Sequence, residues 1–138
     1  VIRIWGLGDQ EIRSKMPTFK DLKIWQESIR LMLTVHKICE KLPKEERFQL
    51  FDQARRSSSS VPDNIAEGYT SYHYNDKINR FYDARKESGE TQNHILKMER
   101  KRYIADYISS NLFDDYQKLI RGINGYINYL KRRRGDKR

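Results

Sequence analysis

The sequence predicts an all-α protein, an up-and-down antiparallel four-helix bundle, and three features of the chain support that fold. Charged residues make up 34% of the 138 residues and hydrophobic residues 37%, with only three prolines, a composition typical of charged helical proteins. Four stretches repeat apolar residues at spacings of three and four, the period of an amphipathic helix. The links between them are short, which favours antiparallel neighbours, and no β-hairpin pattern competes. The length corresponds to one compact domain.

The first predicted helix lies within residues 18–43, directly after Pro17. Thr18 or Asp21 can cap its start, because both side chains accept hydrogen bonds from free backbone N–H groups. Pro43 ends it, because proline disfavours helical backbone at the residue before it. The predicted apolar stripe consists of Leu22, Trp25, Ile29, Met32, Leu33, His36 and Cys39.

The second predicted helix covers residues 46–69 and continues through a run of four serines. Pro62 should kink it, because proline lacks the N–H group and its ring clashes with the carbonyl four residues earlier. Gly68 is the expected stop. The serines are interpreted as small residues that let helices approach closely. The predicted stripe consists of Phe48, Phe51, Ala54, Ser58, Val61, Ile65 and Ala66.

The third and fourth predicted helices cover residues 76–104 and 113–134, with a break at 105–112 between them. The third has a polar middle that includes Gly89, which costs a helix roughly 1 kcal/mol relative to alanine. A polar inner seam or a crowded helix crossing would explain that cost. The third stripe consists of Ile78, Phe81, Tyr82, Arg85, Ser88, Gln92, Ile95 and Met98. The fourth consists of Phe113, Tyr116, Leu119, Ile120, Ile123, Ile127 and Leu130.

The chain divides into a bundle domain at residues 16–131, an N-terminal extension at 1–15 and a basic tail at 132–138. The extension begins without Met and precedes Met16, where the periodic pattern starts, so it is interpreted as either an upstream-derived or a non-native addition. The single Cys39 excludes an internal disulfide and indicates a reducing compartment, so a cytoplasmic location is expected. No apolar run approaches the roughly 20 residues of a membrane span, so no membrane partner is expected.

The known catalytic and cofactor motifs are absent from the sequence. It contains no G-x-S-x-G around the serines and neither of the glycine-rich phosphate-binding patterns. His36, His73 and His94 lie on three different segments without metal-ligand spacing. The chain is therefore predicted to be no enzyme, to hold no cofactor and to bind no metal.

Basic residues are the more informative feature of the composition. The formal net charge is +9, with 28 Lys and Arg against 19 Asp and Glu, which favours a polyanionic partner such as nucleic acid or an anionic membrane surface. Clustered cations can bind phosphates and release counterions, although a solvated face and a disordered tail are the alternative. Tyrosines at 69, 72 and 74 suit either base stacking or a protein interface. The candidate nucleic-acid-binding residues are Arg55, Arg56, Lys97, Arg100, Lys101, Arg102, Lys131, Arg132, Arg133 and Arg134.

Three sequence blocks carry a family resemblance. "FKDLKIWQESIRL" from Phe19, "QARRSSSSVPDNIAEGY" from Gln53 and "RFYDARKESGETQNHI" from Arg80 occur in the order expected of the 23S rRNA intervening-sequence type of four-helix-bundle protein. The chain resembles that family from about Phe19 to Leu130. The matching motif positions are Arg56, Ser60, Pro62, Asn64, Glu67, Gly68, Arg85 and Glu90. The segment "ARKESGE" departs from the Gly-Ser pair that follows the arginine in many relatives.

The resemblance implies a cup-like or barrel-like homopentamer that binds RNA, often encoded within large-subunit ribosomal RNA genes. A related group serves as the accessory variability determinant of diversity-generating retroelements, alongside a reverse transcriptase. The predicted function is therefore a non-enzymatic oligomeric nucleic-acid-binding protein, and the alternative is a protein-interaction scaffold or reverse transcriptase accessory subunit. For the motif, the hypothesis is a polar seam in which Asn64 and Glu67 pair with Arg85 or its neighbours, because a buried carboxylate needs a partner.

Overall fold

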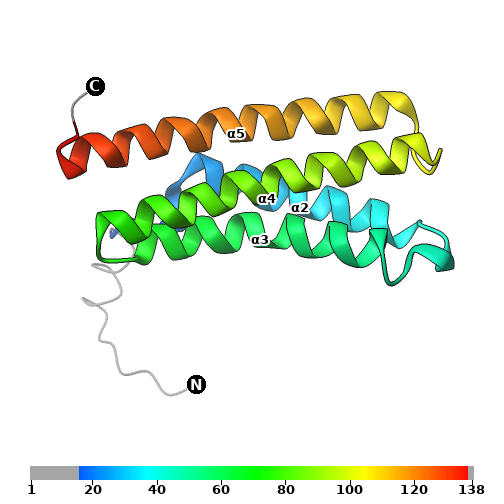
Figure 1. Ribbon diagram of the computed structural model, residues 1–138, viewed down its shortest axis with the longest axis horizontal. Coiled ribbons are helices and arrows are strands. Elements are labelled where there is room, and N and C mark those ends of the chain that lie inside the picture. The colour runs from blue at the N-terminus through cyan, green and yellow to red at the C-terminus, as the bar shows by residue number, and fades with distance from the viewer. Residues whose placement is uncertain (1–15, 137–138) are drawn as a thin grey trace, which may run out of the picture.

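The computed structural model describes residues 16–136, which form four helices (Figure 1). These are α2 (Lys23–Glu40), α3 (Leu50–Thr70), α4 (Tyr74–Arg100) and α5 (Asp106–Arg134), with two short 3₁₀ turns, η1 (Phe19–Asp21) and η2 (Lys44–Glu46). No strand occurs in this part of the chain, so the all-α prediction is confirmed. The predicted N-terminal extension lies outside the described residues. The first three residues of the predicted tail continue α5 as helix.

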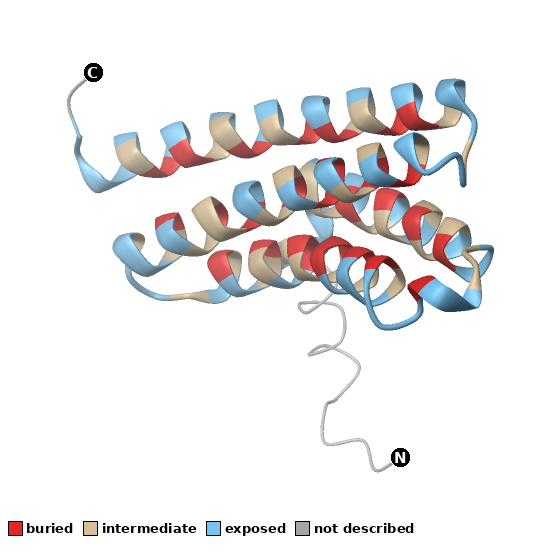
Figure 2. Cartoon of the chain, turned by 45° about the vertical axis from the view of Figure 1, so that its right-hand side comes forward, coloured by how far each residue is buried: buried red, intermediate tan, exposed pale blue. Residues whose placement is uncertain are grey.

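One apolar core runs along the bundle, and every helix turns a buried face toward it (Figure 2). Phe81 and Ile95 of α4 and Tyr116 of α5 are fully buried, and the phenylalanine and isoleucine side chains each contribute roughly 1.5–3 kcal/mol through removal of apolar surface from water. Most of the predicted stripe positions on α3, α4 and α5 belong to this core or pack against it.

The buried face of α2 differs from the predicted stripe. Ser28, Leu31, Val35 and Cys39 are its buried residues, whereas Leu33 is 53% exposed. Apolar residues occur on several sides of this helix, so its neighbours α3 and α5 decide which side is buried. The prediction had the correct period, and Leu22, Trp25 and Cys39 lie in the core or pack against it, but the middle of the stripe has an incorrect phase.

Two predicted helix boundaries are wrong. Helix α3 begins at Leu50, and Phe48 before it is 86% exposed, because residues 47–49 form a turn after η2. Helix α5 begins at Asp106, so residues 106–112 of the predicted break are helical, with Ser109 and Leu112 buried. The connection between α4 and α5 lies at residues 101–105 instead, where Arg102 adopts a φ of 63°.

Helices α3 and α4 approach closely at Gly68, which does not end its helix as predicted. Helix α3 continues through the buried Pro62 to Thr70. A Cβ atom at Gly68 would lie 2.7 Å from Phe81 Cε2, so the glycine is required by packing. Further along the same interface, the Ser57 and Thr91 hydroxyl groups share a buried hydrogen bond of 2.8 Å. The small serine therefore permits close helix contact, as expected.

Thr18 and Asp21 cap the turn η1 and not α2 itself. The Thr18 backbone N–H donates to the Asp21 carboxylate at 2.7 Å, while Thr18 Oγ1 accepts from Lys20 N at 3.2 Å. This reciprocal capping box fixes the entry into the bundle just before α2. Among the described helices, none combines the length and apolar character that crossing a membrane requires.

Candidate nucleic-acid interface

The predicted cations lie at opposite ends of the bundle and do not form one site. Lys97, Arg100, Lys101 and Arg102 lie at the end of α4; we call them the α4-end cluster. Lys131, Arg132, Arg133 and Arg134 form the α5-end cluster at the end of α5. Arg134 donates to Asn75 at the start of α4 at 2.7 Å, which places the α5-end cluster at that end. The 27 residues of α4 therefore separate the clusters by about 40 Å (Figure 1).

Within the α4-end cluster, Lys101 serves the fold. Its ammonium group lies 2.5 Å from the carboxylate of the buried Glu46, which also accepts a 2.7 Å hydrogen bond from the Tyr103 hydroxyl. These two donors, Lys101 first, lower the pKa of Glu46. The contact attaches the turn η2 to the end of α4, and the Glu46 carboxylate offsets the charge of Lys101.

The remaining members of the α4-end cluster are exposed. In residues 16–136, no ion pair involves Lys97, Arg100 or Arg102. Arg100 and Arg102 line a cavity of about 450 Å³ at the α4–α5 connection, together with Glu99, Tyr103 and Asp106. Two carboxylates therefore share this cavity with the two guanidinium groups.

Arg55 and Arg56 on α3 are already engaged by their own helix. Arg56 pairs with Asp52 at 2.6 Å, an exposed i, i+4 contact of a kind that contributes a few tenths of a kcal/mol. The Arg55 guanidinium lies 5.3 Å from the centre of the Phe51 ring. Near it, His36 Nε2 lies 3.1 Å from Ser59 Oγ. Burial, and then the charge of Arg55, lower the pKa of His36, so this histidine adds no cation at neutral pH.

The α5-end cluster adjoins Tyr82, whose ring lies close to two cationic side chains. The Arg85 guanidinium lies 4.9 Å and the Lys131 ammonium 5.5 Å from the centre of the Tyr82 ring. Arg85 also donates to Asn124 of α5 at 2.9 Å. Arg134 pairs with Asp136 at 2.5 Å, which neutralises the last member of the cluster. Arg132 and Arg133 are exposed.

The family-motif residues do not form the expected buried seam with Arg85. Glu67 has 65% of its side chain exposed and approaches Arg80 of α4 only at 4.0 Å. Asn64 donates to the Ser60 carbonyl of its own helix at 2.9 Å. Glu67 reaches only the first turns of α4, and Arg85, further along that helix, turns to α5 instead. The expectation of a buried carboxylate at Glu67 is therefore wrong.

Four other motif residues have local roles. Ser60 Oγ donates to the Arg56 carbonyl at 2.9 Å within α3. On α4, the carboxylate of Glu90 adds to the effect of burial and raises the pKa of Glu87. Gly68 and Pro62 are buried in the α3 interface. The motif therefore shapes the α3–α4 pair and presents no chemical site of its own.

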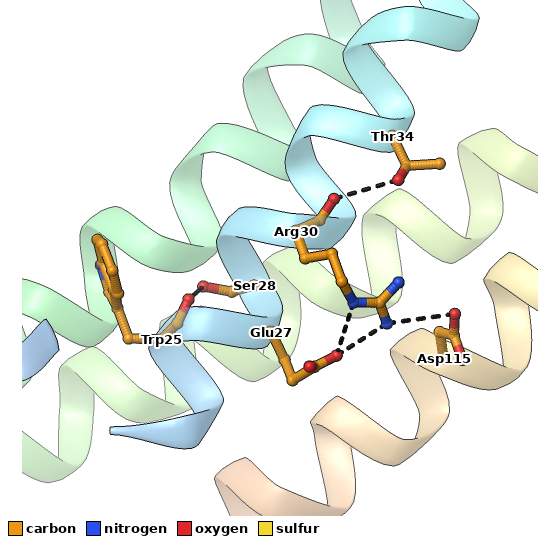
Figure 3. A network of polar contacts seen from close by, with 6 residues as sticks. All are labelled: Trp25, Glu27, Ser28, Arg30, Thr34 and Asp115. Atoms are coloured by element: carbon orange, nitrogen blue, oxygen red, sulfur yellow. Dashed lines mark hydrogen bonds and ion pairs between the residues drawn. The ribbon is translucent and has the colours of Figure 1, made fainter. Parts of the chain in front are cut away.

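A polar network connects α2 with the first half of α5 (Figure 3). The Arg30 guanidinium lies 2.8 Å from Glu27 on its own helix and 3.4 Å from Asp115 on α5. Below it, Ile24 packs so closely that a Cβ on Gly122 would lie 2.8 Å from Ile24 Cγ2. A groove of about 290 Å³ opens beside this contact, lined mainly by apolar atoms.

Sequence reasoning missed two cations, Lys118 and Arg121, both exposed on α5. They do not stand in a run of basic residues, so a search for clusters passes over them. The signal that would have found them is the absence of acidic residues from 116 to 134. Within residues 16–136, no group of three or more His, Cys, Asp or Glu side chains is placed to hold a metal ion.

These observations define a basic all-helical protein with cations exposed at both ends of a four-helix domain. The chain belongs to the family described as 23S rRNA-intervening sequence protein, whose model matches residues 20–125. This confirms the resemblance found in the three sequence blocks.

One solved structure supports the same fold. It is described as a protein with unknown function from the S23 ribosomal protein family of Bacteroides thetaiotaomicron VPI-5482. Its TM-score is 0.71 at 23% sequence identity, and the match covers 76% of this chain and 95% of that chain. No match was found among curated proteins.

Proposed function

We propose that this protein is a non-enzymatic oligomer that binds RNA through phosphate contacts, as the family description suggests. The observation that carries the proposal is the set of exposed cations without an ion pair in residues 16–136, at both ends of the domain. Such side chains bind phosphates at little desolvation cost and release counterions on doing so. The exposed cations without an ion pair are Lys97, Arg100, Arg102, Arg132 and Arg133.

The proposed assembly is a homopentamer of up-and-down antiparallel bundles. Short connections at residues 71–73 and 101–105 support the alternating helix directions. The exposed apolar side chains of Leu33 and Tyr107 support burial against another copy. Mass measurement in solution tests the assembly, and five times the protomer mass is expected. A monomer at micromolar concentration would contradict it.

The RNA-binding proposal is tested by titration of the protein into structured RNA at two or more salt concentrations. We expect affinity to fall steeply as salt rises. A variant with Lys97→Gln, Arg100→Gln and Arg102→Gln should show a shallower dependence, because each lost phosphate contact lowers the slope by about 1.

The matched control removes three exposed lysines from the end of α2 and from η2: Lys37→Gln, Lys41→Gln and Lys44→Gln. It changes the net charge equally and should keep a slope close to that of the wild type. Absence of RNA binding at low salt by the folded oligomer would refute the proposal.

The second candidate is a protein-interaction scaffold, for example an accessory subunit of a reverse transcriptase. It is favoured by two aromatic residues on the connections between helices, Phe48 and Tyr72, which are 86% and 88% exposed respectively. Aromatic residues of this kind anchor protein interfaces. Capture of a reverse transcriptase that survives nuclease treatment and is lost on Phe48→Ser would favour this candidate. Capture that nuclease abolishes would favour RNA binding.

A further inference from the structure

The second part of α5 separates charge in an unusual way. The helix carries Asp106, Asp114 and Asp115 in its first part, and no acidic residue from 116 to 134. Over the same 19 residues it carries six cations: Lys118, Arg121, Lys131, Arg132, Arg133 and Arg134. A solvated helix face normally mixes both signs of charge, so this segment is suited to a polyanion.

Part of this segment forms a single exposed face. Its residues follow spacings of three and four along α5 and are all exposed, and Figure 2 shows the buried residues of α5 on the opposite side. We call this face the α5 strip: Lys118, Arg121, Gly125, Asn128 and Arg132. The 14 residue steps from first to last correspond to about 21 Å of helix.

The polar side chains of the α5 strip are free to bind a ligand. Among the contacts within residues 16–136, no hydrogen bond or ion pair involves the side chain of Lys118, Arg121, Asn128 or Arg132. On the side of the strip that faces α4, Arg85 and Lys131 extend the positive surface over Tyr82. Arg121 and Arg132 thus differ from Arg56 and Lys101, whose charges are neutralised by nearby carboxylates, whereas Lys118 shares its groove with Glu27 and Asp115.

Gly125 lies in the middle of the strip and has no packing function within the protomer. A Cβ atom placed on it would meet nothing within 4 Å, in contrast to Gly122 one turn earlier, which contacts Ile24. Glycine in a helix interior is destabilising relative to alanine, and it lets another molecule approach the backbone closely. The position therefore suits contact with a partner outside the protomer.

We infer that the α5 strip binds the sugar-phosphate backbone of double-stranded RNA. The inference rests on the proposed RNA binding and names its ligand class and surface. Proteins recognise duplex RNA mostly through phosphates and 2′-hydroxyl groups across its wide, shallow minor groove. Lys118, Arg121 and Arg132 supply the phosphate contacts. The Asn128 amide, which donates and accepts hydrogen bonds, faces the 2′-hydroxyl groups.

The aromatic residues beside the strip favour a duplex over a single strand. Single-stranded RNA binds by stacking its bases on open aromatic rings. The Tyr82 ring already carries Arg85 and Lys131. Tyr129 is 44% exposed, but its ring packs against Tyr126 at 5.5 Å between centres. A rigid helix with three cations and an amide, and with one half-exposed ring beside them, matches a backbone more closely than it matches bases.

The test uses a strip variant that combines Lys118→Gln, Arg121→Gln and Arg132→Gln. Its control is the variant described above that removes Lys37, Lys41 and Lys44. The probes are an RNA duplex of about 16 base pairs, its single strand and the matching DNA duplex. The wild type should bind the RNA duplex most tightly. The strip variant should lower the slope of log affinity against log salt by about 2 to 3, while the control keeps the slope. Mass in solution, measured on every sample, should stay unchanged.

Gly125→Ala is the second variant, with Gly89→Ala as its control, because both glycines are helical and have open space at the Cβ position. Both changes should raise the melting temperature, but only Gly125→Ala should weaken duplex binding. Three results would overturn the placement of RNA on the strip. Gly125→Ala could bind duplex RNA as tightly as the wild type, or the strip variant could keep the wild-type dependence of affinity on salt. The third result is a strip variant whose oligomer has a lower mass in solution than the wild type.

The ligand class has its own refuting results. Tighter binding of the single strand or of the DNA duplex would overturn the assignment to duplex RNA while RNA binding itself could stand. A wild-type protein that binds no RNA at all would overturn the proposed function as well. Failure of the strip assignment shows in the variants or in the choice of probe, while the wild type still binds RNA. Failure of the proposed function shows in the wild type, which then binds no RNA. The two failures are therefore distinguishable.

Discussion

The sharpest structural prediction concerns Gly68→Ala at the α3–α4 crossing. The new methyl group would lie 2.7 Å and 2.9 Å from two carbon atoms of the Phe81 ring and 3.1 Å from Arg80 Cβ. The ring is fully buried and packs against Tyr126 at 4.7 Å, so it has little room to move. Forcing a methyl group into a packed core costs about 1–3 kcal/mol. The gain in helix propensity returns less than about 1 kcal/mol, because Gly68 lies close to the end of its helix.

The net expectation is a loss of about 1–2 kcal/mol in the free energy of unfolding. Gly89→Ala is the control, because its new methyl group meets nothing within 4 Å, and it should stabilise by about 0.5–1 kcal/mol. Both are measured by urea unfolding at one fixed protomer concentration, because assembly makes stability depend on concentration. The packing argument is refuted if Gly68→Ala is as stable as Gly89→Ala with an unchanged m-value.

Three further outcomes follow from the buried polar groups. Because contact with Lys101 lowers the pKa of Glu46 below its ordinary value of 4.5, the stabilisation is present above that value and lost as pH falls through the folded pKa. Glu46→Gln should therefore flatten the acid side of the stability profile, measured by urea unfolding between pH 3 and 7. Burial raises the pKa of Cys39 to about 11, so iodoacetamide should label it slowly at pH 8 until urea unfolds the chain. Ser57→Ala and Thr91→Val should each cost about 1 kcal/mol but less than additively in a double-mutant cycle, because they share one hydrogen bond.

Most of the fold was predictable because it depends on period, and period is local. Spacings of three and four identified four helices, and the stripe of the last helix was largely correct. The phase of α2 was not predictable, because Leu31, Leu33 and Val35 are all apolar and only the neighbouring helices decide which are buried. The start of α5 was missed because Ser109 is polar, although the structure buries it as a small residue.

The candidate site was less predictable, because a charge count does not show which charges are paired. Lys101 is a member of a basic run, yet its partner Glu46 lies 55 residues away in sequence. Arg85 similarly finds Asn124 on another helix and not the expected Glu67. The arrangement of cations along one helix is different, since it follows from local spacing alone. Lys118 and Arg121 could therefore have been found in the sequence by their separation from acidic residues.

The residues that build the fold and those assigned to RNA lie on different surfaces. Gly68 and Gly122 are explained by contacts inside the protomer, to Phe81 and Ile24 respectively. Gly125 has no such explanation, although it weakens the same helix. The α5 strip points away from the core, so its side chains can change without loss of buried apolar area. Variants of the strip therefore test RNA binding without disturbing the fold. Changes in the family-motif residues between α3 and α4 would lower stability and, through the loss of folded protein, RNA binding as well.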